Sequence, residues 1–189
     1  AFDSSLPAAW ESTEHPGIRL SSDKPHSGSM SLRIETGQAD DSIQMSESIP
    51  VEAGQQYRIR SHYRVQAFDG TDQGRFYLQA LYQDANGDPI EHRVCRNDFT
   101  IDCQSNDDCQ NGSSCHVRQP NEQLITSNNL KATADWRQHE RTLRPKTYLD
   151  AHTGEPVDAA SMVLRFVKNS SFAGTISFDD ISVEPIVTA

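Results

Sequence analysis

The feature that most constrains the fold is an alternation of apolar and polar side chains between Tyr57 and Gln66. Side chains two positions apart lie on the same face of a β-strand, so this segment predicts a strand with one buried and one polar face. The face expected to point inward carries Tyr57, Ile59, Tyr63 and Val65, and the other carries Arg58, Arg60, His62, Arg64 and Gln66. No segment shows the spacing of an amphipathic helix, which indicates an all-β chain.

Similar segments recur along the chain at the spacing of a sandwich. Predicted strands cover residues 30–34, 42–49, 56–67, 74–84, 89–96, 136–144, 161–168 and 174–184, with a short strand at the N-terminus. The turn formers between Asp84 and Pro89 predict a hairpin that joins the strands on either side of them. Eight to ten strands without repeats predict a β-sandwich of the jelly-roll type.

The last predicted strand changes its buried face halfway along. Alternation puts one apolar pair, Ile176 and Phe178, and a second pair, Ile181 and Val183, on opposite faces. This switch predicts a bulge or kink at Asp179 and Asp180. If the second pair points inward, Asp179 points inward with it, and a buried carboxylate needs a partner or a metal ion. The alternative is that both aspartates end the strand at the surface.

Length and charge limit the classes of function. The chain has 189 residues, which fits one domain covering residues 1–189, and its net charge is −10. This charge argues against nucleic acid as a partner. No apolar run approaches the ~18 residues needed to span a membrane. Residues 186–189 are predicted to begin a linker to an attached catalytic domain.

The four cysteines, Cys95, Cys103, Cys109 and Cys115, lie in one short polar window. An even number of cysteines among turn formers predicts two disulfides and a secreted protein. Zinc is the alternative, although the spacings are long for a zinc ribbon or finger. Three disulfide connectivities are possible, and residues 97–123 are predicted to form a disulfide-bearing loop insertion.

Four short pieces of sequence carry a family resemblance. They are residues 23–34 (DKPHSGSMSLRI), Val51-x-Ala-Gly-x-x-Tyr57, Asp135-Trp136 before an alternating strand, and Phe178-Asp-Asp-Ile-Ser-Val183. In this order they resemble the jelly-roll carbohydrate-binding modules of the family 4, 9 and 22 type. The resemblance covers residues 1–96 and 124–185. It implies a non-catalytic module of a secreted polysaccharide-degrading enzyme, which binds a polysaccharide on a concave β-sheet face.

The resemblance also implies a structural Ca²⁺ away from the sugar site. By position, its ligands are expected from Asp3, from backbone oxygens around Asp23, Lys24 and Ser27, and from Asp179 and Asp180. These segments supply the hard oxygen ligands that Ca²⁺ prefers, and the ion would join the two ends of the chain. His26 is expected to brace its loop rather than bind the ion.

A glycan site is expected on the polar faces of the middle strands, where this acidic chain concentrates arginine. Of its 17 basic residues, 13 are Arg, which suits bidentate binding of carboxylate or sulfate. The candidates are Arg58, Arg60, His62, Arg64, Arg75, Tyr77, Arg137 and His139. Tyr77 is the expected stacking platform, and Trp136 is assigned to the core.

Two arrangements of these arginines are open. If their rows lie side by side on a concave sheet, they predict a cleft for an anionic polysaccharide such as a uronate polymer or a sulfated galactan. Alternatively, the arginines form surface ion pairs with Glu91, Glu140 and acidic loop residues.

Two other functions are also open. A jelly-roll polysaccharide lyase would act by β-elimination on a uronate polymer, using a Tyr or His base and an Arg or His that neutralises the carboxylate. Tyr77, His62, His92, His139 and the arginine rows are the candidates for those roles. A spacer domain that binds nothing is the third possibility. No paired carboxylates stand out for hydrolysis, and the sequence has no Gly-x-Ser-x-Gly element.

Overall fold

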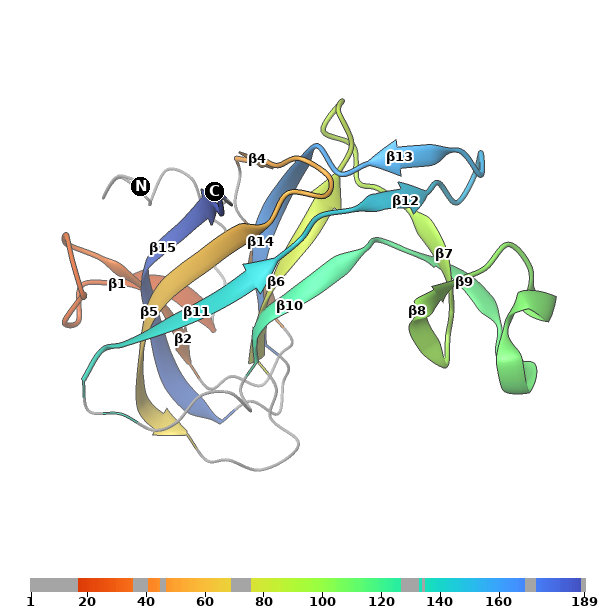
Figure 1. Cartoon of the computed structure of the whole chain (residues 1–189). Coiled ribbons are helices and arrows are strands. Elements are labelled where there is room, and N and C mark those ends of the chain that lie inside the picture. The colour runs from red at the N-terminus through yellow and green to blue at the C-terminus, as the bar shows by residue number, and fades with distance from the viewer. Residues whose placement is uncertain are drawn as a thin grey trace.

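The computed structural model is a sandwich of two antiparallel sheets (Figure 1). It describes residues 17–35, 41–44, 47–68, 76–126, 133, 135–168 and 173–187. The first sheet has the order β1 (Ile18–Ser21), β2 (Ser31–Glu35), β15 (Gly174–Pro185), β5 (Tyr57–Phe68), β11 (Arg137–Leu143). The second has the order β10 (Asn121–Thr126), β6 (Phe76–Gln83), β14 (Ser161–Lys168), β3 (Asp41–Gln44), and β4 (Ile49–Pro50) also pairs with β14.

The all-β sandwich predicted from the alternation is therefore confirmed. Among the described residues, no helix has the length and apolar character needed to cross a membrane.

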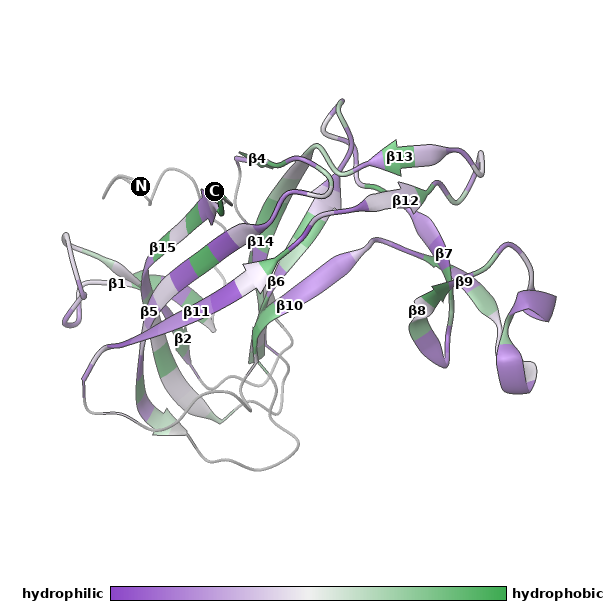
Figure 2. Ribbon diagram, viewed as in Figure 1, coloured by the Kyte–Doolittle hydropathy of each residue, from purple (hydrophilic) through white to green (hydrophobic). Residues whose placement is uncertain are grey.

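Both sheets bury the apolar side of their alternation, which Figure 2 shows as bands of opposite hydropathy along β5. Ile59, Tyr63 and Val65 are buried as predicted and belong to one core with the inner side chains of the second sheet. Phe178 joins the two sheets, because its ring centroid lies 5.2 Å from that of Phe76 and 5.1 Å from that of Phe166. Each fully buried large apolar side chain contributes about 1.5–3 kcal/mol to folding.

The predicted bulge in β15 is present at Asp179 and Asp180. The register pairs Asp179 with His62 and Ser182 with Arg60, so two residues of β15 stand opposite one residue of β5. Asp180 takes a positive φ of 49°. The extra residue keeps Phe178 and Ile181 both in the core. Asp179 lies opposite His62 on the outer face, so the inward direction predicted for Asp179 is wrong.

The cysteines lie in a separate three-stranded sheet, here called the disulfide sheet, with the order β8 (Asp98–Asp102), β7 (His92–Cys95), β9 (Cys115–Arg118). Two short 3₁₀ helices, η2 (Asn106–Asp108) and η3 (Gln110–Gly112), connect β8 to β9. Disulfides join Cys95 to Cys109 and Cys103 to Cys115, with Cα–Cα distances of 5.5 and 5.9 Å. The two predicted disulfides are confirmed, and the connectivity is now assigned.

Both ends of the disulfide sheet return to Tyr82 of β6. The Ile90 amide donates to the Tyr82 carbonyl at 3.2 Å, and the Gln119 side chain donates to the same carbonyl at 3.2 Å. The Tyr82 amide in turn donates to the Pro120 carbonyl at 3.5 Å. The strands β12 (Thr147–Leu149) and β13 (Pro156–Asp158) form a hairpin next to β7. Figure 1 shows the disulfide sheet extending to one side of the sandwich beneath this hairpin.

Two details of the sequence prediction differ from the structure. The turn after β6 forms, because Asp84 Oδ1 accepts from the amides of Asn86 and Asp88 at 2.9 Å each. The predicted hairpin is wrong, however, because β7 leaves β6 after one bridge between Gln83 and Pro89 and pairs with β8 and β9. Residues 121–123, assigned to the insertion, belong to β10 of the second sheet.

Candidate functional site

The predicted arginine row is present on the outer face of β5, and we call Arg58, Arg60, His62 and Arg64 the Arg-rich face. Its guanidinium groups are already paired. Arg58 Nε lies 3.1 Å from Glu140 Oε1, and Arg60 Nε donates to Glu140 Oε2 at 2.9 Å. Arg60 Nη1 also donates to Glu184 Oε2 at 3.3 Å. The hydrogen bond from Arg60 and the nearby charge of Arg58 hold the pKa of the Glu140 carboxyl below its usual value.

The surface ion pairs named as the alternative are therefore confirmed for Glu140. The other named acid, Glu91, pairs with His152 Nε2 at 2.8 Å instead of with an arginine.

The 23–28 loop covers the far end of the Arg-rich face. Arg64 Nη2 donates to the Asp23 carbonyl at 2.9 Å, and Trp136 Nε1 donates to the Lys24 carbonyl at 3.1 Å. The Arg64 guanidinium lies over the Trp136 ring, 5.4 Å from its centroid. Arg33 pairs with the Asp23 carboxylate at 2.8 Å. Trp136 thus braces this loop on the outer side, and its assignment to the core is wrong.

The remaining predicted glycan residues do not join this face. Arg137 pairs with Tyr63 and His139 with Ser61, so both share the inner side of the first sheet. His139 Nε2 lies 3.3 Å from the Leu124 carbonyl at the edge of the sandwich. Tyr77 lies on the second sheet, and Arg75 falls outside the described residues. The described candidates lie on different faces, so the structure does not bring them together into the one site that was predicted.

The outer side of the second sheet, here called the Tyr77 face, carries a different set of polar groups. The register aligns Gln123, Gln79, Arg165 and Gln44 in one row across four strands, and Thr126, Tyr77, Val167 and Ser42 in the next. The Gln79 amide oxygen accepts from Arg165 Nε and Nη2 at 2.9 and 2.6 Å in the amide orientation that satisfies both groups. Tyr77 and Arg165 are half-buried, and Gln123 is exposed. An aromatic ring therefore lies beside a row of amide and guanidinium groups.

The last-strand aspartates hold the 23–28 loop. Asp179 Oδ2 accepts from the amides of His26 and Ser27 at 2.8 and 3.1 Å, and Asp179 Oδ1 accepts from the Asp180 amide at 2.9 Å. Asp180 Oδ2 lies 2.5 Å from His26 Nδ1, and Asp180 Oδ1 accepts from the Ser27 hydroxyl. The expectation that His26 braces this loop agrees with these contacts.

The described residues do not form a calcium cage by themselves. Both oxygens of Asp179 accept backbone amides, and the carbonyls of Asp23 and Lys24 accept from Arg64 and Trp136. Hard cations need several converging oxygen ligands, whereas two arginines surround Asp23. Asp3, the remaining predicted ligand, lies outside the described residues.

One cluster of potential ligands lies beside this loop. His26, His62 and Asp180 bring three ligand atoms within 4.8 Å of one another. The two imidazole rings are stacked, with centroids 3.8 Å apart and planes 10° from parallel. Their lone pairs therefore lie in two nearly parallel planes about one ring stack apart and do not meet at one point, which does not suit the tetrahedral geometry of zinc. Burial and the neighbouring His26 lower the pKa of His62.

Two cavities border the disulfide sheet. The first, here called the Phe99 pocket, has a volume of about 390 Å³ and is lined by His92, Phe99, Arg118, Pro120, Asn121, Gln123, Lys146 and Tyr148. Phe99 is 53% exposed, and the Arg118 guanidinium lies over its ring at 4.3 Å from the centroid. The sequence patterns did not indicate this pocket. The only signal was a single aromatic residue in an otherwise polar insertion.

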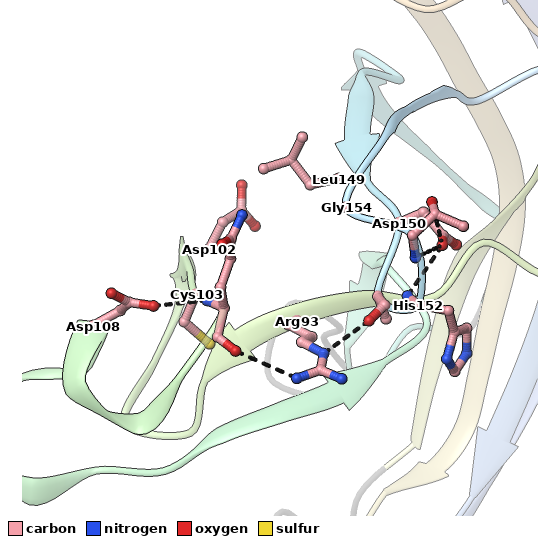
Figure 3. A pocket seen from close by; sticks show the side chains of 11 residues that line it. Arg93, Asp102, Cys103, Asp108, Leu149, Asp150, His152 and Gly154 are labelled. Atoms are coloured by element: carbon pink, nitrogen blue, oxygen red, sulfur yellow. Dashed lines mark hydrogen bonds between the residues drawn. The ribbon is translucent and has the colours of Figure 1, made fainter.

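The second cavity lies between the disulfide sheet and the turn after β12 and has a volume of about 600 Å³ (Figure 3). Its polar groups bond to its own walls. Arg93 Nε donates to the Ala151 carbonyl at 2.9 Å, and Arg93 Nη1 donates to the Gln104 carbonyl at 3.3 Å. Asp108 Oδ2 accepts two backbone amides, and Asp150 Oδ1 does the same in its own turn. The hydrogen bonds around this cavity therefore connect the disulfide sheet to the turn after β12.

The sequence matches no protein-family model and no curated protein. Among solved structures, the CBM22-1 and GH10 modules of Clostridium thermocellum xylanase 10B, complexed with xylohexaose, match with a TM-score of 0.51 and 10% identity. The match covers 96% of this chain and 26% of that one. The CBM22-1 xylan-binding domain of Paenibacillus barcinonensis Xyn10C matches with a TM-score of 0.46 and 11% identity, covering 96% and 88%. The fold is therefore that of the jelly-roll carbohydrate-binding modules which the sequence pieces resemble.

Proposed function

We propose that this chain is a non-catalytic polysaccharide-binding module whose ligand lies along the Tyr77 face. The observation that carries the proposal is the half-buried Tyr77 ring beside the exposed Gln123 and the half-buried Arg165 and Gln44, with the buried Gln79 amide holding Arg165 in the same row. An aromatic ring offers an apolar surface for the C–H face of a sugar. Amide and guanidinium groups offer donors and acceptors in fixed directions for its hydroxyls. The spacing of neighbouring strands, about 4.8 Å, sets the repeat of these groups along the chain of sugars.

The four candidate bases lie on different surfaces of the molecule. A lyase needs its base and its carboxylate-neutralising group around one substrate carbon. In this chain, His62 lies on the outer side of the first sheet, His139 on its inner side and Tyr77 on the second sheet. His92 lies in the disulfide sheet. The four therefore do not act together on one substrate carbon. His62 shares its face with three arginines and His92 lines the same pocket as Arg118, so analysis of the products decides between binding and elimination.

The context of the module follows from the same proposal. Two disulfides favour an oxidising compartment and hence secretion. Attachment to a glycoside hydrolase or a polysaccharide lyase is the corresponding proposal for the full-length protein. Because two fold neighbours are described as a xylan-binding domain and a xylohexaose complex, xylan is the first neutral polysaccharide to test.

The test is affinity electrophoresis of wild type, Tyr77→Ala and Arg60→Gln in gels that contain one polysaccharide each. Tyr77→Ala should weaken retention by about tenfold, the effect of losing roughly one stacking contact. Arg60→Gln, on the Arg-rich face, is the control and should change it less than about twofold. Equal retention of Tyr77→Ala and wild type would contradict the proposal. Absence of retention on every polysaccharide would favour a spacer, and ultraviolet-absorbing unsaturated products would favour a lyase.

A structural Ca²⁺ between the N-terminal segment, the 23–28 loop and Asp179 remains a prediction, since it depends on Asp3. If it binds, excess calcium at a hundredfold over Kd should stabilise the fold by about 2.7 kcal/mol. The measurement is the melting temperature with calcium and with chelator, together with elemental analysis. Asp3→Ala is the informative variant, because Asp179→Ala removes loop hydrogen bonds whether or not a metal is present. An identical melting temperature in chelator and no bound metal would contradict this prediction.

A further inference from the structure

We infer that the Phe99 pocket binds the carboxylate or sulfate group of an acidic polysaccharide. The inference rests on the proposed function, because it takes the polysaccharide to be the ligand of the adjoining Tyr77 face. It moves the expected anion site away from the Arg-rich face and into a cavity that the disulfide sheet helps to build.

The pocket is continuous with the Tyr77 face. Gln123 lines the pocket and stands opposite Gln79 in the polar row of that face. Asn121 also lines the pocket and stands opposite Leu81, on the same side of the sheet. Gln123, which is exposed, is therefore the residue that the Tyr77 face and the pocket share. The far wall of the pocket is formed by Phe99 of β8 and Arg118 of β9.

The charge of the pocket is opposite to that of the chain as a whole. The chain carries 27 acidic and 17 basic side chains, yet none of the described residues that line this cavity is acidic. Within the described residues, neither Arg118 nor Lys146 is within ion-pair distance of an acid. Two acids lie beside the lining residues: Asp102 Oδ1 is 3.4 Å from His92 Nδ1, and Glu122 accepts from the Tyr82 hydroxyl at 3.3 Å.

Aromatic rings hold the two cations in place. Arg118 lies over Phe99, and Lys146 Nζ lies 5.8 Å from the centroid of the Tyr148 ring. A cation–π contact leaves the guanidinium N–H donors without a hydrogen-bond acceptor, and no acceptor for Arg118 lies among the described residues, so these donors suit a bidentate ligand. A carboxylate or a sulfate presents two oxygens at the matching spacing. The Asn121 and Gln123 amides lie at the rim for the hydroxyls of the same sugar.

The size of the pocket suits one sugar ring. Its volume of about 390 Å³ is at the lower end of the range for small-molecule pockets. Burial lowers the pKa of His92, and the charges of Arg118 and Lys146 lower it further, against the opposing effect of Asp102. His92 thus adds a neutral imidazole at neutral pH, and the positive charge comes from Arg118 and Lys146.

The first experiment compares retention on polygalacturonate, dextran sulfate and neutral xylan. Arg118→Gln and Lys146→Gln should each weaken retention on at least one acidic polymer by about tenfold, as expected for losing a hydrogen bond to a charged group. Retention on xylan should change less than about twofold. Arg96→Gln removes an equal charge from an exposed position after β7 and is the matched control. Preference for polygalacturonate would identify carboxylate as the ligand group, and preference for dextran sulfate would identify sulfate.

The second experiment tests the pocket independently of any polymer. In NMR titrations of the wild-type protein with glucuronate and with inorganic sulfate, the Arg118 Nε–Hε signal should shift saturably. Xylose should leave it unchanged. A saturable shift supports anion binding in the pocket, whatever the result for Tyr77→Ala. Unchanged xylan retention in Tyr77→Ala would count only against the Tyr77 face. Absence of a shift with both anions, or equal losses in Arg118→Gln and Arg96→Gln, would overturn the inference while leaving xylan binding at Tyr77 possible.

Discussion

The Arg-rich face and the Phe99 pocket both present arginine to solvent, but they differ in what lies next to the guanidinium groups. On the Arg-rich face, Arg58 and Arg60 pair with Glu140. In the Phe99 pocket, Arg118 lies on an aromatic ring. An anion must displace a carboxylate in the first region and only water in the second. The availability of arginine for a ligand is therefore decided by its neighbours and not by how many arginines share a strand.

The largest expected effect on polysaccharide retention comes from removing the disulfides. This change should disrupt the Phe99 pocket and leave the sandwich, with its Arg-rich face, intact. The buried apolar cluster of the disulfide sheet consists of Cys95, Cys103 and Cys109, with Ile101 and Cys115 packed against it, so the bridges make up most of this cluster. Each bridge closes a short loop and contributes about 3 kcal/mol in the chain-entropy model. We expect the double variant Cys103→Ser/Cys115→Ser to open the sheet and lose retention on acidic polymers more than about tenfold, while retention on xylan persists.

Limited proteolysis checks this separation. In the double variant, cleavage should become rapid between residues 96 and 115 and remain slow in the sandwich, which has its own core. Wild type under the same conditions is the control. Uniform cleavage of the whole chain would show that the two parts do not unfold separately.

An intermediate effect on retention is expected from Glu140→Gln. This change would give the Arg-rich face an arginine without a carboxylate partner, as in the Phe99 pocket. The change leaves Arg58 without its carboxylate partner and leaves Arg60 with only Glu184. Retention on acidic polymers should rise by about two- to threefold, since exposed charges are screened by salt. The charge-matched control is Glu155→Gln, at an exposed turn. An equal rise in both variants would mean that net charge alone determines retention.

The smallest expected effect is a pH dependence of stability from His92. Burial lowers its pKa in the folded protein, whereas an unfolded histidine titrates near pH ~6.5. Below that pH the unfolded chain binds a proton that folded His92 does not, so the free energy of unfolding should fall as the pH falls below about 6.5 and stay level above it. Urea denaturation between about pH 5 and 8 should give a shallower acid slope for His92→Gln. An unchanged slope in that variant would contradict this assignment.

The fold could be predicted largely because alternation reports burial directly. Tyr57, Ile59, Tyr63 and Val65 are buried as expected. The same reasoning gave the wrong face in β11, where Trp136 was taken as the inward residue. Trp136 precedes the strand and packs on the 23–28 loop. Leu143, which is 2% exposed, is the residue that identifies the inner face of β11.

The site was harder to predict because it depends on register between distant segments. Arg60 meets Glu140 across 80 residues and Glu184 across 124, and alternation within a strand contains no information on such pairings. Tyr77 was identified correctly as lying on a polar face, but that face belongs to the other sheet. The Phe99 pocket combines β7, β8, β9, β10 and the start of β12, so no single segment of the sequence could have indicated it.

The return of both ends of the disulfide sheet to Tyr82 has a consequence for how this protein can change. Entry and exit meet at one residue of β6, so the segment between them can be lengthened, shortened or exchanged without altering the register of the sandwich. Its own bridges hold the segment together, and His92 and Arg93 connect it to the β12–β13 hairpin. We expect exchange of the part beyond these two residues to change ligand preference, so the same junction is a place to graft a foreign recognition loop.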